Sequence, residues 1–327
     1  MGGYWRPRAG ATVAGVLAAI AGGVGAARML RGLAAVVPPA EITAIVNTAD
    51  DFRLHGLAIS PDLDTVTYTL ADAANQALGW GLEGETWKVM EQLERLGGET
   101  WFRLGDRDLA THLYRTQRLA SGASLSDVAA ALAQAWGLQT RLLPMTDSPV
   151  ETRLVVGGQG ETDDEDEIGF QDYFVARRHS VPVRSVRFAG VSDSVPGPDV
   201  LAALADAERV VICPSNPIVS VGPVLAVPGI RDAVAARRPD VVAVSPIIAG
   251  AAIKGPADRL MRELGHESTV VGVARLYADV AGTLVIDSAD AALAPAVEDV
   301  GLRCVVAPTV MSSPDAAAAL ARVIVSC

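Results

Sequence analysis

Cysteine, aromatic residues and lysine are scarce in this chain of 327 residues. Its three cysteines, Cys213, Cys304 and Cys327, lie far apart and match no metal-ligand spacing, which excludes a disulfide framework and is typical of a reducing compartment. Aromatic residues make up only 5% of the chain, but half of all residues are hydrophobic, so a disordered, collagen-like or coiled-coil protein is excluded. The net charge of −11 repels polyanions, so we expect no nucleic-acid partner.

A strongly apolar run that could span a membrane is also lacking. Arg6 and Arg8 precede an uncharged run, Ala9–Ala27, whose position suggests a signal peptide or a short anchor. A spanning helix needs about 20 strongly apolar residues, whereas this run consists mostly of alanine and glycine. We therefore expect an N-terminal tail at 1–12, then a buried strand, and a cytoplasmic protein that makes no contact with a membrane.

Short apolar runs, often β-branched, alternate along the chain with stretches of helical spacing, which is typical of a parallel sheet built from βαβ units. We predict an α/β fold: a Rossmann-like, mostly parallel sheet flanked by helices, formed by 13–66 and 180–327. A smaller, mainly helical insert with short strands and an acidic loop is expected at 67–179. The expected strands are Val13–Ile20, Ile42–Val46, Arg153–Val156, Phe170–Val175, Arg209–Cys213, Val241–Ser245, Val270–Val273, Thr283–Ile286 and Arg303–Val306. The expected helices include Ala26–Leu33, Val128–Trp136, Gly229–Arg237, Pro256–Leu264 and Ser313–Val325.

Polar and glycine-rich motifs follow several of these strands: Gly22-Gly23-Val24-Gly25, 47–51, Pro214–Pro217 and Ser245-Pro246. Ligands bind at the carboxyl ends of the strands in an open parallel sheet, so we expect these motifs to share one site. The glycines allow the backbone to approach a phosphate, although a tight turn that packs helix against strand explains them equally well. Their spacing matches neither the dinucleotide fingerprint nor a P-loop.

Four carboxylates lie within fifteen positions: Asp50, Asp51, Asp62 and Asp64. They would repel one another unless solvent or a cation compensated them, and Mg²⁺ prefers such hard oxygen ligands. A phosphate-binding loop beside an acidic loop predicts metal-assisted transfer of a phosphoryl-type group. The alternative is that Asp62 or Asp64 caps a helix beginning near Thr65.

A second polar motif, Gly105–His112, opens a helix in which Asp106 is expected to be the N-cap. Arg103, Arg107 and His112 are alternatively placed to gather an anionic substrate. Only two lysines occur, and Lys254 directly precedes a glycine and a helix start, which suggests a point charge for phosphate. His55 attracts attention only because it lies between the two acidic pairs.

Taken together, these motifs resemble one protein family. They are Gly22–Arg28, Asn47–Asp51, Ile59–Thr65, Leu104–His112, Leu142–Met145, Pro214–Ile218 and Ser245–Ile248, in that order and over nearly the whole chain. They resemble the 2-phospho-L-lactate transferases and the related actinobacterial phosphoenolpyruvyl transferases of coenzyme F420 biosynthesis. The arginine-rich, lysine-poor composition favours the phosphoenolpyruvyl donor.

The resemblance implies an enzyme that uses a guanosine diphosphate conjugate of enolpyruvate or lactate as donor. The ribityl hydroxyl of 7,8-didemethyl-8-hydroxy-5-deazariboflavin attacks the phosphorus that carries the acid, and GMP leaves. The family uses Mg²⁺ and forms homodimers.

Carried over residue by residue, the resemblance implies a pyrophosphate site at Gly22, Gly23 and Gly25. It implies a guanosine site at Ser215, Asn216 and Ser220, with Lys254 nearby. Asp50 and Asp62 become the metal ligands. Asp64 contacts the deazaflavin, with Arg103 and His55 beside it, and Asp64 and Asp50 are the catalytic candidates.

Two other classes remain open. A non-catalytic regulator that binds a nucleotide sugar, similar to the gluconeogenesis factors, would share the glycine turn and the Asp50-Asp51 pair. An oxidoreductase that uses NAD(P) needs an acid about 20 residues beyond the glycines to bind ribose, and Asp50 lies 25 residues beyond Gly25.

Overall fold

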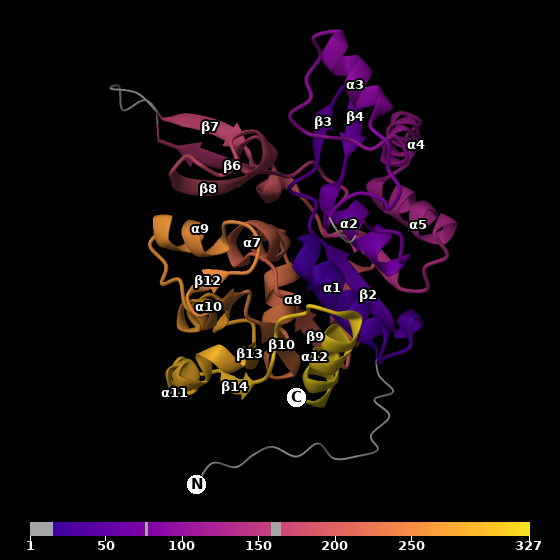
Figure 1. Cartoon of the computed structure of the whole chain (residues 1–327). Coiled ribbons are helices and arrows are strands. Elements are labelled where there is room, and N and C mark those ends of the chain that lie inside the picture. The colour runs from indigo at the N-terminus through magenta and orange to yellow at the C-terminus, as the bar shows by residue number, and fades with distance from the viewer. Residues whose placement is uncertain (1–15, 76–77, 158–164) are drawn as a thin grey trace.

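The molecule is organised around one sheet of seven parallel strands (Figure 1). The computed structural model describes residues 16–75, 78–157 and 165–327. The strand order is β14-β13-β10-β9-β1-β2-β5, and every neighbouring pair is parallel. The bounds are β1 Leu17–Ala21, β2 Ile42–Val46, β5 Arg141–Pro144, β9 Arg209–Ile212, β10 Val241–Val244, β13 Thr283–Ile286 and β14 Arg303–Val306.

Helices cover both faces of this sheet, which is why β1 and β10, in its middle, are apolar at every position. Successive side chains of β1 alternate between two hydrophobic clusters, with Ala18 and Ile20 in one and Leu17 and Ala19 in the other. Buried residues of one cluster come from α1 Gly23–Ala34, α2 Pro61–Leu70, α5 Leu125–Ala135 and α12 Pro314–Ser326. Those of the other come from α6 Val200–Asp206, α7 Gly222–Ala226, α8 Ile230–Ala236, α9 Ala257–Glu263, α10 Val270–Tyr277 and α11 Ala294–Asp299.

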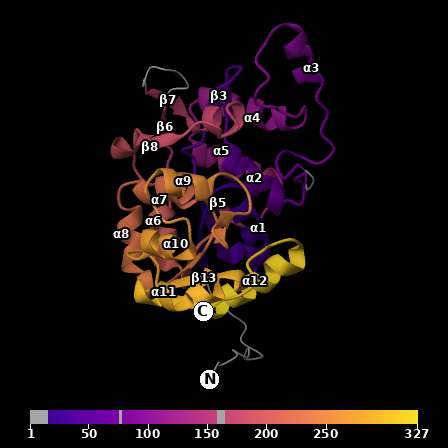
Figure 2. The same cartoon turned by 60° about the vertical axis from the view of Figure 1, so that its left-hand side comes forward.

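Two smaller units stand above the sheet (Figures 1 and 2) and lie apart in the view of Figure 1. One is an antiparallel sheet of order β7-β6-β8, formed by β6 Glu151–Val156, β7 Asp166–Gly169 and β8 Val183–Ala189. The other contains the hairpin β3 Phe52–Leu54 and β4 Leu57–Ile59, with α3 Lys88–Arg95 and α4 Asp108–Ala120. The remaining short elements are β11 Ile247–Ile248, β12 Ala251–Ala252, and the turns η1 Pro39–Glu41, η2 Asp172–Ala176, η3 Val191–Asp193, η4 Pro217–Val221, η5 Arg238–Asp240 and η6 Ser288–Leu293.

The predicted α/β fold is confirmed, but several element assignments are wrong. Val270–Val273 opens helix α10, because Thr269 caps it by accepting a hydrogen bond from the Gly272 N–H at 3.2 Å. A short apolar run fits a buried helix as well as a strand. Phe170–Val175 contains a π-helical turn, η2, whose Tyr173 is buried in a local cluster.

Strand and helix starts differ as well. Helix α1 begins at Gly23, three residues before its expected start, and α2 begins at Pro61, so neither Asp62 nor Asp64 precedes it. Strand β5 lies within the stretch expected to be the insert, yet it pairs with β2 in the main sheet. The first residues of the expected strand Val13–Ile20, and all of the tail at 1–12, lie outside the described residues.

Among the described residues, no single helix combines the length and apolar character that crossing a membrane requires. One pair, Pro217–Ala226 with Ile230–Ala236, meets those criteria jointly by length and composition but is bent by 95°.

Candidate functional site

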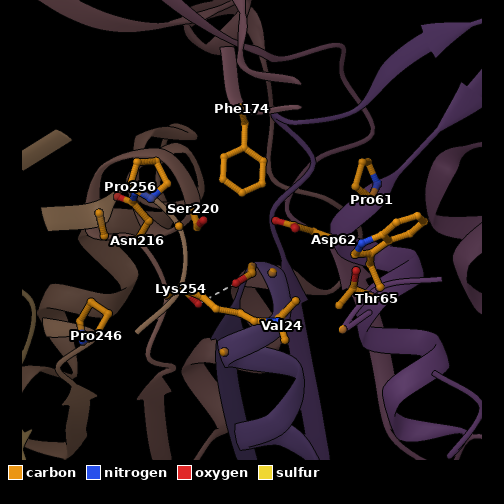
Figure 3. Close-up of a pocket in the computed structure, with 18 of the residues that line it drawn as sticks. Val24, Pro61, Asp62, Thr65, Phe174, Asn216, Ser220, Pro246, Lys254 and Pro256 are labelled. Carbon is orange, nitrogen blue, oxygen red and sulfur yellow. Dashed lines mark hydrogen bonds between the residues drawn. The ribbon is translucent and has the colours of Figure 1, made fainter. Parts of the chain in front are cut away.

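A cavity of about 1060 Å³ opens at the carboxyl ends of β1, β2, β9 and β10. Its walls come from the main sheet below and from the two smaller units above. Ten of the predicted site residues line it: Gly22, Gly23, Gly25, Asp50, Asp62, Arg103, Ser215, Asn216, Ser220 and Lys254. Figure 3 shows Asp62 on one side of the space, Asn216 and Ser220 on the other, and Phe174 above. The expectation that the strand-end motifs converge is therefore confirmed.

The glycine turn serves two different purposes. Gly23 has a φ of +70°, which favours glycine, and it is the first residue of α1, so the positive end of that helix faces the cavity. A Cβ at Gly22 would lie 2.9 Å from both the Asp62 Oδ2 and the Ser220 Cβ. A Cβ at Gly25 would lie 2.2 Å from the Pro214 carbonyl oxygen, so Gly25 also allows α1 to pack closely against the end of β9.

The loop after β9 is fixed by its own polar side chains. Ser215 Oγ donates to the Gly22 carbonyl at 2.8 Å and so joins this loop to the glycine turn. Asn216 Oδ1 accepts from the Ile218 N–H at 2.9 Å and caps η4. Ser220 follows on η4 and faces Asp62 across the cavity (Figure 3).

Asp50 and Asp62 form an acidic pair at this edge of the sheet. Asp62 lies in the first turn of α2 and accepts a hydrogen bond from the Asn47 Nδ2 at 3.0 Å. Burial raises the pKa of Asp62 to about 6 against the hydrogen bonds from Asn47 and the Gly23 backbone. Burial and then the charge of Asp62 raise the pKa of Asp50 well above its usual range.

The acidic pair fits a divalent cation. Both side chains line the cavity, and the buried Asp50 Oδ1 has no hydrogen-bond partner. Two neighbouring carboxylates repel each other when both are ionised, and a cation bound between them removes that repulsion. Carboxylate oxygens are hard ligands, which Mg²⁺ prefers.

Asp64 does not line the cavity. It points to the opposite side of α2, where its Oδ1 accepts a hydrogen bond from the guanidinium of Arg115 and its Oδ2 lies 3.7 Å from the His112 Nδ1. The ligand atoms of Asp64, Asp108 and His112 lie within 4.8 Å of one another, so this buried group could hold a metal ion. The acceptor contact expected for Asp64 stays a prediction.

Of the other two residues predicted to contact the deazaflavin, Arg103 and His55, only Arg103 lines the cavity. Arg103 lines the cavity, and its guanidinium lies over the ring of Trp87 at 4.5 Å from the ring centre. His55 is exposed in the turn between β3 and β4, with a φ of 52°, and does not line the cavity.

The capping expectations need correction. The N-cap of α2 is Ser60, so Asp62 and Asp64 lie inside the helix. Asp106 does not cap α4; it accepts hydrogen bonds from the Lys88 and Val89 N–H groups, both at 3.1 Å, at the start of α3. Glu85 takes its place at α4 by accepting from the Arg107 and Asp108 N–H groups. These caps cross between segments, so no local sequence pattern reveals them.

The aromatic lining of the cavity and two of its cations were not predicted from the sequence. Phe174 stacks between Phe170, at 5.5 Å, and His179, at 5.7 Å. Arg28 and Arg178 also line the cavity, and within the described residues neither forms an ion pair with a carboxylate. The run of apolar and aromatic residues at 170–175 was the available signal, but it also predicts a strand.

The chain matches the family model described as 2-phospho-L-lactate transferase CofD over residues 17–299. It is 46% identical over 307 residues to the phosphoenolpyruvate transferase of Streptomyces griseus, covering 93% of this chain and 95% of that protein. It is 39% identical over 304 residues to the 2-phospho-L-lactate transferase of Methanosarcina mazei, covering 93% and 97%.

Among solved structures, a Bacillus halodurans protein of the UPF0052 family has a TM-score of 0.58 at 17% identity, covering 94% of this chain and 97% of that one. At that identity the likeness concerns the fold alone. The sequence comparisons show that this chain is a transferase and belongs to the 2-phospho-L-lactate transferase CofD family.

Proposed function

We propose that this protein transfers a phosphoenolpyruvyl, or 2-phospho-L-lactyl, group in coenzyme F420 biosynthesis. The donor is the guanosine diphosphate conjugate of the acid, the acceptor is the ribityl hydroxyl of 7,8-didemethyl-8-hydroxy-5-deazariboflavin, and GMP is released. The observation that carries the proposal is that a helix N-terminus, the acidic pair and several cations without carboxylate partners among the described residues converge in one cavity. A diphosphate donor and a neutral hydroxyl acceptor need these groups.

Each wall of the cavity has a distinct task in this reaction. The backbone amides at Gly22 and Gly23, at the start of α1, bind the diphosphate, because they carry the positive end of the helix dipole. Ser215, Asn216 and Ser220 line the opposite wall, where we place the guanosine. The Lys254 Nζ lies close to Gly79, since a Cβ added at that glycine would be 2.5 Å from it. Lys254 therefore places its positive charge beside the Gly79 loop, which lines the cavity.

Asp50 and Asp62 would hold Mg²⁺, which when bound neutralises charge on the diphosphate. We place Asp50 to accept the proton of the attacking hydroxyl, since Asp50 lines the cavity and its buried Oδ1 has no hydrogen-bond partner. Arg103 lines the cavity near the aromatic residues Trp80, Trp101 and Phe102, where we place the deazaflavin.

The relatives support the enolpyruvyl donor. Phosphoenolpyruvate transferases from Streptomyces griseus and Kitasatospora aureofaciens are 46% and 45% identical, whereas the 2-phospho-L-lactate transferase of Methanosarcina mazei is 39% identical. The homodimer implied by the family resemblance stays a prediction.

Purified protein incubated with the deazaflavin, Mg²⁺ and each guanosine diphosphate conjugate in turn tests the proposal. We expect a phosphodiester of the deazaflavin and GMP in equal amounts by mass spectrometry, with the faster reaction from the enolpyruvyl donor. Tight binding of a nucleotide sugar without turnover of either donor would instead support the regulatory alternative.

A further inference from the structure

Arg115 is the only arginine or lysine that is buried among the described residues. It lies in the middle of α4 with a relative exposure of 1% and does not line the cavity. Burying a guanidinium is costly unless several groups compensate it.

The hydrogen bonds of Arg115 lead to two neighbouring elements. Its Nη1 donates to the Ala58 carbonyl at 3.2 Å, in β4, and its Nη2 donates to Asp64, in the first turn of α2. The residues between these two points are Ile59, Ser60, Pro61, Asp62 and Leu63. One side chain thus holds both flanks of the segment that presents Asp62 to the cavity.

Neighbouring groups fix Arg115 and Asp64 in turn. Tyr68 donates its hydroxyl to the Asp108 Oδ1 at 2.6 Å, and the His112 Nε2 lies 3.2 Å from the Asp108 Oδ2. The His112 Nδ1 faces the Arg115 Nη1 at 3.2 Å. Tyr68 belongs to α2, whereas Asp108, His112 and Arg115 lie on one face of α4. Two of these three, Asp108 and His112, belong to the sequence motif Gly105–His112.

The same cation acts on the strand-end acids. Ser60 donates to the Asp51 Oδ2 at 2.6 Å, so the start of α2 is tied to the residue after Asp50. Burial raises the pKa of Asp51, while the Ser60 hydrogen bond and the charge of Arg115 act in the opposite direction. Arg115 is therefore the compensating charge for the carboxylates that turn away from the cavity.

We propose that Arg115 is a positioning residue, which through Asp64 and the Ala58 carbonyl holds the first turn of α2 in the place where Asp62 can bind a divalent cation with Asp50. Asp64 and the Gly105–His112 motif then act from behind the site and do not touch substrate. The cation-binding part rests on the proposed function. The anchoring of the helix start rests only on the contacts above.

The test compares Arg115→Gln, Arg115→Lys and the double variant Asp64→Asn/Arg115→Gln with the parent. Arg118→Gln is the matched control, since it removes the same charge from an exposed position three residues further along α4. Hydrogen exchange of the peptide covering 60–66 reports the start of α2. Binding of Mn²⁺, followed by electron paramagnetic resonance with GDP present, reports the acidic pair without turnover.

We expect Arg115→Gln to exchange faster at 60–66 and to bind Mn²⁺ roughly 10-fold or more weakly, the size seen when outer-shell partners of a metal site are lost. Arg115→Lys should restore part of the affinity, and Arg118→Gln should match the parent. If Arg115→Gln does not fold, the double variant, which removes both partners of the Arg115–Asp64 ion pair, carries the test.

An affinity for Mn²⁺ equal to that of the parent in a folded Arg115→Gln or double variant overturns the proposal. A merely structural role would reduce the amount of folded protein but leave the affinity of the folded fraction unchanged. Failure of the parent itself to bind Mn²⁺ would contradict the proposed function and not the anchoring, which the exchange measurement decides separately.

Discussion

At the scale of single residues, Gly22 shows how little space separates the two walls of the cavity. Its φ of −161° is extended backbone that any residue adopts, so only space opposes a side chain there. A Cβ would lie 2.9 Å from the Asp62 Oδ2 and would force that carboxylate or Ser220 aside. We therefore expect Gly22→Ala to lower the transfer rate by roughly 100-fold, because small misplacements of reacting groups are that costly.

Steady-state rates with saturating donor, together with the melting temperature, check this expectation for Gly22→Ala. The matched control is Gly122→Ala, at a position with a φ of +89° and no atom within 4 Å of the added Cβ. The control should lose some stability, because its backbone is strained, but keep the parent's rate. A Gly22→Ala enzyme as fast as the parent would show that transfer tolerates displacement of whichever of Asp62 and Ser220 moves aside.

Most site residues could be predicted because they follow strands. Gly22, Asp50 and Ser215 come after β1, β2 and β9, and parallel strands bring their carboxyl ends to one edge. Phe174 and Arg178 could not be placed in this way. They lie in a turn of the smaller antiparallel unit, and nothing local in the sequence states where that unit packs against the sheet.

At the scale of secondary-structure elements, α3 and α4 exchange caps. Asp106, before α4, accepts from the first amides of α3, and Glu85, before α3, accepts from those of α4. We expect Asp106→Ala to weaken the start of α3 by about 1 kcal/mol, the usual worth of a cap. Hydrogen exchange should then quicken in α3 and remain unchanged in the main sheet.

The capping exchange has an internal control. Asp127 completes the capping box of α5 with Ser124, so Asp127→Ala removes a capping aspartate that acts within its own helix. It should quicken exchange in α5 only. Equal protection of α3 in the parent and in Asp106→Ala would mean that packing, and not this cap, holds the helix.

Elements differ in how far sequence determines them. The sequence predicts a helix at Val128–Trp136, and α5 begins three residues earlier, at Leu125, because Ser124 and Asp127 form a capping box within one turn. The run Val270–Val273 failed because its β-branched residues suit a strand, while the Thr269 cap and burial on the sheet face make it a helix. Local propensity is a weak guide where tertiary packing decides between two buried states.

At the scale of the whole molecule, the charged groups that line the cavity suit ligand binding but lower the stability of the folded chain. The chain carries a net charge of −11, yet Arg28, Arg103, Arg178 and Lys254 line the cavity without carboxylate partners among the described residues, beside two acids kept in a buried position. Such a site suits a ligand that brings anionic phosphates together with a cation. Without that ligand the buried carboxylates destabilise the fold.

The effect of Asp62 on stability has a definite sign. Burial raises its pKa from 3.8 to about 6 in the folded chain. Its contribution to the free energy of unfolding is fully present below pH 4 and is lost as the pH rises through 6, because the unfolded chain releases the proton more readily. The loss amounts to at most about 3 kcal/mol, at 1.36 kcal/mol for each pKa unit.

Asp62→Asn should therefore be more stable than the parent at pH 7.5 and equally stable at pH 4, since the amide keeps an oxygen for the Asn47 Nδ2 and carries no charge. Urea unfolding at several pH values measures this difference, with the exposed Asp206→Asn as a control that should show none. Mg²⁺ with GDP at pH 7.5 should stabilise the parent and leave Asp62→Asn almost unaffected, because a bound ligand adds stability only to the state that binds it. A variant that is less stable than the parent at pH 7.5 would mean that Asp62 is already compensated within the protein, and that this edge of the sheet needs no cation.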